Sequence, residues 1–414
     1  MPLRQENVPR VMVTGLGLRT PAGSTVNAFW EGLLSGHSFA APIRGFDTTG
    51  FPVNFACEIR DFEPRDYLRQ RELTNLDRSS QLGIAAAADA IEDAALAPID
   101  STRCAVVAGC AMGGLGSLHK QVAVVMSSGP QRINPLAATI FMPNATASLL
   151  SMRFGFEGPS LCIATACAAG ADAIGEALGL VRSGVADLVV AGGAEAAVIP
   201  ATMAAFSRLG ALSQRVDDPA TASRPYDRDR DGFVLGEAAA FLVLERSDLA
   251  LTRKARIYAE LAGYGRNCDA YHLTRPVPGG IRAKQCMGLA LTDAGLAPGD
   301  VMHVNGHGTS TLLNDETEAQ AICALFGIDR PPVTSIKGAV GHSIGAAGAL
   351  EAVATILSVR NGLVPPTANC RHVDLNLDVV IDRPRRIRKG PGISNSFAFG
   401  GHNASLVFTP APAS

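Results

Sequence analysis

Two stretches of the chain occur twice, and this repetition restricts the folds that the chain can adopt. Residues 90–100 match residues 290–300 at seven of eleven positions. Residues 168–184 and residues 346–362 both begin with Ala-Ala-Gly-Ala, which is followed at the same distance by Val-Arg-X-Gly. Two matches in the same order predict a chain built from two similar halves, with a boundary near residues 250–255.

Each half, residues 1–252 and residues 253–414, is expected to alternate strands and helices. Short apolar runs predict strands that are covered on both faces, and long Ala-rich segments without interior proline predict helices. The predicted strands are residues 11–13, 104–108, 188–191, 241–244 and 406–408. The predicted helices are residues 80–96, 171–182, 281–294, 316–325 and 346–359. This alternation predicts an α/β protein whose sheets are sandwiched between helices.

The composition excludes several classes of protein. Hydrophobic residues make up 47% of the 414 residues and charged residues 18%, which permits a large core and excludes a mainly disordered chain. A net charge of −2 provides no basic field for nucleic acid. We find no signal-peptide pattern and no apolar run of about eighteen residues, so we expect a soluble, cytoplasmic protein without membrane insertion. The nine cysteines form no Cys-X-X-Cys pair, so we expect no metal site.

Cys167 differs from the other cysteines because it is expected at a junction between a strand and a long helix. It lies in Ile-Ala-Thr-Ala-Cys-Ala-Ala-Gly-Ala. Free backbone N–H groups and the helix dipole at such a position stabilise a thiolate and lower the pKa of the thiol. This position favours a nucleophile, and the alternative is a small residue selected for close packing.

Two of the eight histidines, His307 and His342, lie in glycine-rich loops that follow short apolar runs. Glycine permits a ligand to approach the backbone closely, so these positions indicate a binding or catalytic site rather than core packing. In the repeat, Cys167 aligns with Gly345. If the halves pack about a pseudo-twofold axis, the two helix N-termini approach each other and Cys167 meets the histidines.

Four motifs around these residues carry a resemblance to a known family. They are Thr-Ala-Cys-Ala-Ala-Gly, Gly-His-Gly-Thr-Ser-Thr, Ile-Lys-Gly-X-X-Gly-His and Ser-Asn-Ser-Phe-Ala-Phe-Gly-Gly-His-Asn. The chain resembles the β-ketoacyl-[acyl-carrier-protein] synthases of the elongating, type II-like branch of the thiolase superfamily, which includes discrete type II polyketide ketosynthases. The resemblance spans residues 11–408 and implies a thiolase-like five-layer αβαβα sandwich built from two pseudo-twofold-related halves.

The resemblance also implies an acyltransferase that extends acyl chains by decarboxylative Claisen condensation. Cys167 would hold the acyl group, and the backbone N–H groups of Cys167 and Phe399 would form the oxyanion hole. His307 and His342 would donate hydrogen bonds to the thioester oxygen of a malonyl group that loses carbon dioxide.

Lys337 and Glu351 match the family's charged pair. The resemblance implies that Lys337 orients His307 electrostatically and that Glu351 belongs to a hydrogen-bond network. Asp315 and Glu318 are further possible charge partners of Lys337. Without the motif, Lys337 would be read as a solvated loop residue and Glu351 as a surface helix residue.

Further residues match the family's substrate-binding positions. The pantetheine-binding positions are Thr309 and Thr311. The positions of the acyl pocket and its gate are Met112, Phe206 and Phe399. The basic residues that could dock an acidic carrier protein are Arg69, Arg71 and Arg208.

The implied partners are an acyl carrier protein, whose phosphopantetheine carries the substrates, and a second subunit. The chain would form a homodimer, or a heterodimer with a Cys-less, ketosynthase-like chain-length factor. The resemblance implies no metal and no redox cofactor. A nicotinamide site is disfavoured because Gly15, Gly17 and Gly23 do not fit the Gly-X-Gly-X-X-Gly spacing.

Three departures from the family pattern leave the substrate open. Gly306 stands where alanine is usual, Leu312 where proline is frequent, and His402 where many fatty-acid enzymes have threonine. These residues lie near the expected substrate path, so we favour polyketide over fatty-acid biosynthesis without excluding either. The alternatives are a non-elongating acyltransferase or decarboxylase of the superfamily, or a subunit that is active only with a chain-length factor. A silent chain-length factor is disfavoured because it would lack Cys167.

Overall fold

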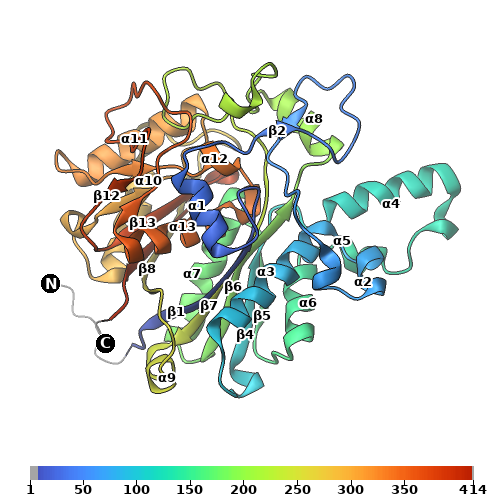
Figure 1. The fold of residues 1–414 in the computed structure, drawn as a ribbon, viewed down its shortest axis with the longest axis horizontal. Coiled ribbons are helices and arrows are strands. Elements are labelled where there is room, and N and C mark those ends of the chain that lie inside the picture. Colours follow the sequence, from blue (N-terminus) through green and yellow to red (C-terminus); the bar gives the residue numbers. More distant parts are fainter. Residues whose placement is uncertain (1–7, 413–414) are drawn as a thin grey trace.

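The computed structural model describes residues 8–412, which form a large mixed β-sheet flanked by helices (Figure 1). In sheet order its strands are β10 (Val333–Thr334), β9 (His303–Asn305), β13 (Gly392–Phe397), β14 (His402–Pro410), β8 (Ala259–Cys268), β1 (Val11–Arg19), β7 (Glu237–Arg246), β6 (Leu188–Ala196), β4 (Cys104–Gly109) and β5 (Ser160–Ile163). Every strand predicted from an apolar run lies within one of these strands.

The sheet consists of two five-stranded halves with the same topology. β7, β6, β4 and β5 follow β1 in one half, and β14, β13, β9 and β10 follow β8 in the other. In both halves the first three strands pair antiparallel and the last three pair parallel. The halves are joined where residues 11–13 pair antiparallel with residues 259–261. The duplicated topology agrees with the internal repetition, while the boundary after residue 252 stays a prediction.

The long helices complete a five-layer αβαβα sandwich, the fold class that the resemblance implied. They are α3 (Arg78–Ala94), α6 (Ala145–Phe154), α7 (Ala169–Arg182), α10 (Ile281–Ala294), α11 (Leu312–Phe326) and α13 (Ala347–Asn361). α7 and α13 pack against each other between the half-sheets. α3 and α6 cover one outer face, and α10 and α11 cover the other. The five predicted helices are present, with ends shifted by at most four residues.

Alternating strand residues explain how each half-sheet is covered on both faces. In β6, Val189 and Ala191 pack in the central core with α7 and α13, whereas Leu188 and Val190 pack under α3. Side chains of a strand point alternately to its two faces, so an uninterrupted apolar run suits a strand between two helical layers. α13 is apolar around most of its circumference because it lies in the central layer, where nearly all its residues are buried.

Glycines allow the two central helices to touch. A Cβ atom on Gly170 of α7 would lie 2.8 Å from the backbone nitrogen of Ala349, and one on Gly348 of α13 would lie 2.7 Å from that of Ala171. Residues 170 and 171 align with residues 348 and 349 in the repeat, so the two contacts are equivalent. This reciprocity is the direct sign of the pseudo-twofold axis.

Shorter elements surround this framework. The remaining helices are α1 (Val26–Leu34), α2 (Gln70–Asn75), α4 (Leu115–Ser128), α5 (Ala137–Phe141), α8 (Pro200–Leu209), α9 (Ser247–Thr252) and α12 (Lys337–Val340). The remaining strands are β2 (Ala41–Pro42), β3 (Phe55–Ala56), β11 (Leu363–Val364) and β12 (Arg385–Arg386). Within residues 8–412, none of the helices has the length and apolar character needed to cross a membrane.

Candidate active site

Cys167 lies in a strained turn between β5 and α7. The turn is a single 3₁₀ turn over Ala166–Ala168, and Ala166 has a φ of +50°. The second half repeats it over Ile344–Ala346, with a φ of +47° at Ile344. A left-handed conformation costs a residue other than glycine about 1–3 kcal/mol, so its presence at aligned positions indicates a turn that both halves require.

Only the first of these turns carries a reactive side chain, because Gly345 has no room for one. A Cβ atom there would lie 2.3 Å from the backbone nitrogen of Ala111 and 2.6 Å from Oε2 of Glu195. The buried Glu195 accepts hydrogen bonds from the N–H groups of Ala111 and Met112 at 2.6 and 3.3 Å. Burial raises the pKa of Glu195 to about 7. No sequence motif around Glu195 indicates that its carboxylate binds the N–H groups of Ala111 and Met112.

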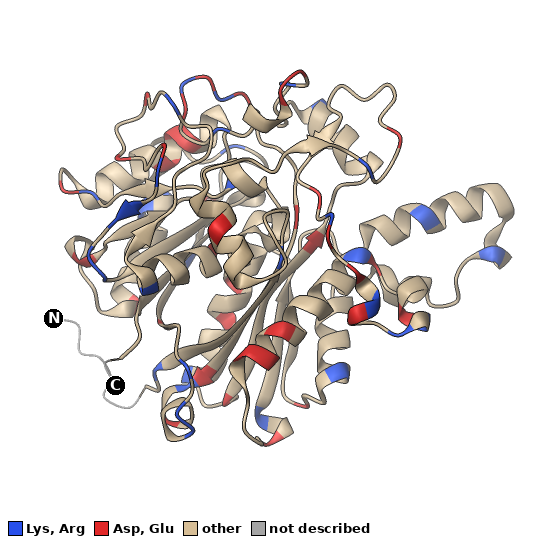
Figure 2. Ribbon diagram, in the orientation of Figure 1, with Lys and Arg blue, Asp and Glu red and all other residues tan. Residues whose placement is uncertain are grey.

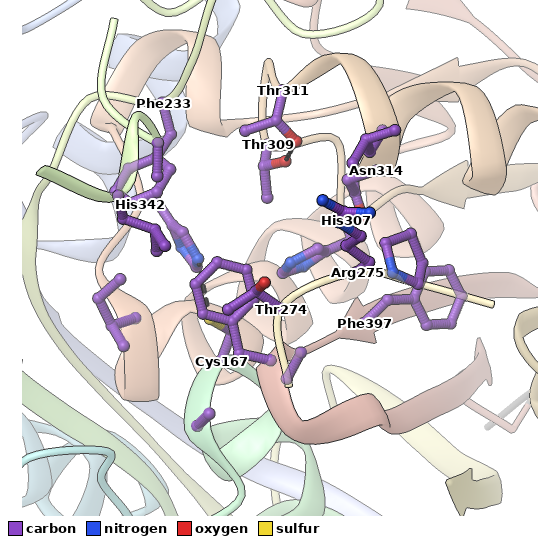
Figure 3. Close-up of a pocket in the computed structure, with 18 of the residues that line it drawn as sticks. Cys167, Phe233, Thr274, Arg275, His307, Thr309, Thr311, Asn314, His342 and Phe397 are labelled. Atoms are coloured by element: carbon purple, nitrogen blue, oxygen red, sulfur yellow. Dashed lines mark hydrogen bonds between the residues drawn. The ribbon is translucent and has the colours of Figure 1, made fainter. Parts of the chain in front are cut away.

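The structure brings Cys167, His307 and His342 together (Figure 3). Nε2 of His342 lies 3.1 Å from Sγ of Cys167, and the two imidazole centroids are 5.4 Å apart. One potential ligand atom from each of the three residues lies within 4.8 Å of the other two. All three side chains are buried. The cysteine comes from the first half and both histidines from the second, in agreement with the alignment of the helix N-termini.

Lys337 determines the tautomer of His307. Its Nζ lies 3.3 Å from Nδ1 of His307 and 2.5 Å from the backbone oxygen of that residue, and it forms an ion pair with Glu351. An ammonium group has donors only, so Nδ1 accepts and the ring proton lies on Nε2. The Lys337–Glu351 pair is buried, and each charge offsets the desolvation of the other.

Burial keeps both imidazoles neutral. Desolvation, followed by the charge of Lys337, lowers the pKa of His307 and of His342 well below the ordinary value. Each neutral ring therefore offers one N–H donor. Within the described residues, Nδ1 of His342 has no hydrogen-bond partner, so no neighbour fixes its tautomer and Nε2 can accept a proton or donate one.

The expectation of a lowered pKa for Cys167 is wrong. Burial raises the pKa of its thiol to about 12, and this outweighs the opposite effects of Lys337 and of the backbone N–H of Phe399, which hydrogen-bonds to the sulfur. Burial disfavours the charged form of a thiol and so raises its pKa. Cys167 is therefore a neutral thiol that must pass its proton to a base, and Nε2 of His342 is within hydrogen-bond distance.

Glu318 and Tyr226 hold the loop that carries His307. The carboxylate of Glu318 accepts hydrogen bonds from the N–H groups of His307 and Gly308 at 2.7 and 2.8 Å, and from the hydroxyl of Tyr226 at 3.0 Å. A Cβ atom on Gly306 would lie 2.0 Å from that hydroxyl oxygen. Glycine at 306 is therefore required by Tyr226, a residue that the sequence analysis did not single out.

Asp315 and Glu318 were expected as possible charge partners of Lys337, but the structure gives Lys337 a different direct partner, Glu351. Asp315 instead lies 3.9 Å from Arg230. Glu318 accepts backbone hydrogen bonds and acts on Lys337 only electrostatically from a distance. Both carboxylates are already engaged with other donors, which explains the difference.

The three reactive side chains line a cavity of about 760 Å³. The other predicted substrate-binding residues that line it are Met112, Phe206, Thr309, Thr311 and Phe399. The hydroxyl oxygens of Thr309 and Thr311 are 2.8 Å apart, and both side chains appear in Figure 3 above the imidazoles. Phe233, which the sequence analysis did not name, also lines the cavity and packs edge-on against His342 with centroids 5.3 Å apart.

The three arginines proposed for carrier docking are exposed but lie on different elements. Arg208 is on α8, next to Leu209 and Gly210, which line the cavity. Arg69 and Arg71 lie at the start of α2, outside the cavity lining. Of the three, Arg208 is therefore the one placed at the cavity.

The donor set of Cys167, His307 and His342 would also suit a zinc ion, which binds thiolate sulfur and imidazole nitrogen. A metal there would occupy the sulfur and both rings at once. Binding of zinc and use of the same sulfur as a nucleophile are therefore alternatives.

Comparison with known proteins gives the same picture as the geometry. Residues 9–250 match the family model for the β-ketoacyl synthase N-terminal domain, and residues 258–371 match that for the C-terminal domain. The chain belongs to the β-ketoacyl synthase family. It is an enzyme of the ketosynthase class, because relatives that match it over nearly the whole chain are named 3-oxoacyl-[acyl-carrier-protein] synthase.

One relative of this β-ketoacyl synthase is a 3-oxoacyl-[acyl-carrier-protein] synthase 2 of Synechocystis sp., 42% identical over 96% of this chain and 97% of the relative. Another is the chloroplastic 3-oxoacyl-[acyl-carrier-protein] synthase I of Hordeum vulgare, 41% identical over 97% of this chain and 89% of the relative.

Solved structures of similar chains include the ishigamide ketosynthase/chain length factor, with 36% identity and a TM-score of 0.92 over 98% of this chain and 100% of that one. A type II polyketide ketosynthase, solved with its acyl carrier protein and bound to the hexaketide, has 31% identity and a TM-score of 0.90 over the same shares.

Proposed function

We propose that this β-ketoacyl synthase condenses malonyl-acyl carrier protein with an acyl group held on Cys167 and releases carbon dioxide and β-ketoacyl-acyl carrier protein. The observation that carries the proposal is the 3.1 Å contact between Sγ of Cys167 and Nε2 of His342, beside His307, in one cavity. A thiol, a proton acceptor and a second N–H donor are the groups that this reaction requires.

In the first half-reaction the thiol of Cys167 passes its proton to Nε2 of His342 while the sulfur attacks the acyl thioester. The backbone N–H groups of Cys167 and Phe399 stabilise the oxyanion. The carbon–sulfur bond to pantetheine then breaks, and the leaving thiolate takes the proton from His342. His342 suits this transfer because its ring is neutral at the start. Its lowered pKa means that, after taking the thiol proton, the ring readily gives that proton to the leaving thiolate and becomes neutral again.

In the second half-reaction the malonyl carboxylate leaves as carbon dioxide, and its bonding electrons form an enolate. The Nε2–H groups of His307 and His342 donate hydrogen bonds to the enolate oxygen, and Lys337 holds His307 in the tautomer that this requires. The enolate carbon attacks the acyl thioester, and Cys167 leaves as a thiolate that takes one proton from solvent. Thr309 and Thr311 would hold the pantetheine arm, and Met112, Phe206 and Phe399 would line and gate the acyl pocket.

We favour type II polyketide biosynthesis as the pathway and keep fatty-acid elongation as the alternative. Polyketide-related ketosynthases among the structural neighbours support the first, and relatives named 3-oxoacyl-[acyl-carrier-protein] synthase 2 support the second. The Gly306–Tyr226 contact shows that one departure from the family pattern is a packing requirement rather than a substrate signal.

The proposed partners are an acyl carrier protein and a second ketosynthase-like chain, identical or Cys-less. α4 projects from the body of the molecule in Figure 1, and Figure 2 shows little charge on it. Val122 and Met126 on this helix are 53% and 82% exposed. Exposed apolar side chains gathered on a projecting segment support a subunit interface.

The reaction written above needs no metal and no redox cofactor, and we propose that none takes part. We expect activity to survive treatment with a chelator and to fall when zinc is added, because zinc would bind the sulfur of Cys167. The proposed compartment is the cytoplasm.

The test uses Cys167→Ala and Cys167→Gln with carrier-bound substrates. Both variants should lose condensation, because neither can hold an acyl group. Cys167→Gln should keep or raise malonyl decarboxylation, because the histidines and the carrier site remain. Chain elongation by either variant would refute the proposal. Acyl groups of varied length, offered with and without a Cys-less partner subunit, distinguish the two pathways and the two subunit arrangements.

A further inference from the structure

Two cysteines outside the catalytic group form a close thiol pair. Sγ of Cys110 lies 3.7 Å from Sγ of Cys162. Cys110 directly follows β4, Cys162 lies in the neighbouring β5, and the N–H of Cys110 donates to the carbonyl oxygen of Ile163 at 3.0 Å. Both sulfurs lie within hydrogen-bond distance of the same carbonyl oxygen, that of Pro143, at 3.4 and 3.2 Å. The two sulfurs are therefore held on the same side of the sheet and face each other.

The two thiols have unequal environments. Cys110 is 4% exposed, whereas Cys162 is half-buried and lines a second cavity of about 730 Å³ together with Arg266 and His402. The hydrogen bond between the thiols, followed by burial, raises the pKa of Cys110, and the same hydrogen bond lowers the pKa of Cys162. Cys162 is thus the more exposed of the two residues and the thiol that loses its proton first, with Cys110 behind it.

We propose that Cys110 and Cys162 form a reversible disulfide by exchange with a low-molecular-weight disulfide. The thiolate of Cys162 attacks one sulfur of the reagent, forms a mixed disulfide and expels one small thiolate. Cys110 then attacks the Cys162 sulfur and expels the second small thiolate, and the proton of Cys110 goes to solvent. The protein dithiol is oxidised by two electrons, and the small disulfide is reduced to two thiols.

The exchange requires only a short movement. A disulfide has an S–S length of about 2.05 Å, so the sulfurs must approach by about 1.6 Å. Cys110 directly precedes Ala111 and Met112, which line the catalytic cavity and whose N–H groups are held by Glu195. The disulfide would therefore form in the segment that carries one wall of the acyl cavity.

The test uses the Cys167→Ala chain, so that the catalytic thiol does not react. The folded protein is incubated with hydroxyethyl disulfide, free thiols are blocked with iodoacetamide, and the digest is analysed by mass spectrometry. We expect one linked peptide pair that contains Cys110 and Cys162 and that a reductant separates. The exposed Cys268 should carry the small thiol as a mixed disulfide, which shows that the reagent reached the protein.

Two matched variants distinguish the steps. In the Cys167→Ala chain, adding Cys110→Ser should stop the reaction at a stable mixed disulfide on Cys162, and adding Cys162→Ser should leave Cys110 as a free thiol. The proposal is overturned if both cysteines are recovered alkylated while Cys268 is modified, if Cys162 keeps the small thiol although Cys110 is present, or if Cys162 links to Cys268. Circular dichroism before digestion verifies that each chain remains folded.

Discussion

The reactivity of this ketosynthase depends on a few buried side chains, and their charges are set by removal from water. Cys167 is neutral because burial outweighs the charge of Lys337, and both histidines are neutral because burial and that charge both lower their pKa. A buried ion pair, Lys337 with Glu351, lies directly behind His307. The site therefore works by moving a proton between neutral groups and by hydrogen bonds prepared in advance.

Replacing either histidine tests the hydrogen bonds to the enolate. His307→Ala and His342→Ala should each lower the rate of malonyl decarboxylation by about 10²–10³, because each removes one donor to the developing charge. Acyl loading of Cys167 should fall less in His307→Ala, whereas His342→Ala should also slow loading because it removes the base that takes the thiol proton. Two rates are measured: release of carbon dioxide from malonyl-acyl carrier protein, and transfer of an acyl group from acyl-acyl carrier protein to Cys167.

His372→Ala, at an exposed histidine outside the cavity lining, is the control for these histidine variants. It should leave both rates unchanged. Normal malonyl turnover in both active-site variants would contradict the role given to the imidazoles.

The raised pKa of Cys167 predicts a particular pH dependence of alkylation. Only the thiolate reacts, and a pKa of about 12 means that its fraction grows about tenfold for each pH unit between pH 7 and 10. The rate of iodoacetamide labelling at Cys167 should therefore rise over this range without levelling. A small-molecule thiol, with a pKa near 8.5, should level by about pH 10 under the same conditions. A plateau for Cys167 below pH 8 would show that the thiolate is stabilised after all.

How much of the site could be predicted depends on whether a residue belongs to a local motif. Cys167, His307 and His342 have glycine-rich or helix-terminal contexts, and the repeat indicated that they would meet. Tyr226 and Glu195 have no such signal, because their partners are distant in sequence and the contacts exist only after folding. The pKa of Cys167 was predicted with the wrong sign because the helix dipole is visible in the sequence and the depth of burial is not.

At the scale of the elements, the contact between α7 and α13 decides how the two strained turns meet. Gly170 permits this contact, whereas Gly179, nine residues further along α7, has nothing within 4 Å of a Cβ position. Two glycines of one helix therefore occupy opposite environments.

Alanine at these two positions should have opposite effects on stability. Gly170→Ala should lower the free energy of unfolding by about 1–3 kcal/mol, because the methyl group would press on the backbone of Ala349. Gly179→Ala should raise it by about 0.5–1 kcal/mol through helix propensity. Urea denaturation of the two variants gives both values. Equal effects would contradict the close packing of the central helices.

The five predicted strands and five predicted helices could be recognised because each buries an apolar run in one layer of the sandwich. Strands β8 and β13 of the main sheet and helices α4 and α6 were not predicted. The two-residue strands β2, β3, β11 and β12 were not predicted, because they carry too little periodicity to stand out from loops. The start of α11 was also missed by four residues, since Leu312 begins it beside the cavity and its side chain is exposed.

At the scale of the molecule, the two halves depend on each other. The central helices come one from each half, β1 pairs with β8 across the junction, and the nucleophile and the histidines lie on opposite sides of it. We therefore expect residues 1–252 and residues 253–414 to fold together rather than separately.

Expressing the two fragments tests this dependence. Alone, neither should show a cooperative unfolding transition, because each exposes the apolar face of α7 or of α13. Co-expressed, they should copurify and recover malonyl decarboxylation. A cooperative transition in the first fragment by itself would mean that the halves are independent domains.

The most direct test of the account is the mass of the intact protein after incubation with an acyl-acyl carrier protein. We predict that the wild-type chain gains the mass of one acyl group, located by digestion at Cys167, and that added malonyl-acyl carrier protein removes it as β-ketoacyl product. Cys167→Ala should gain nothing. Acylation at another residue would contradict the central claim. An unchanged mass of the wild-type chain with every acyl carrier protein and every partner subunit tested would also contradict it.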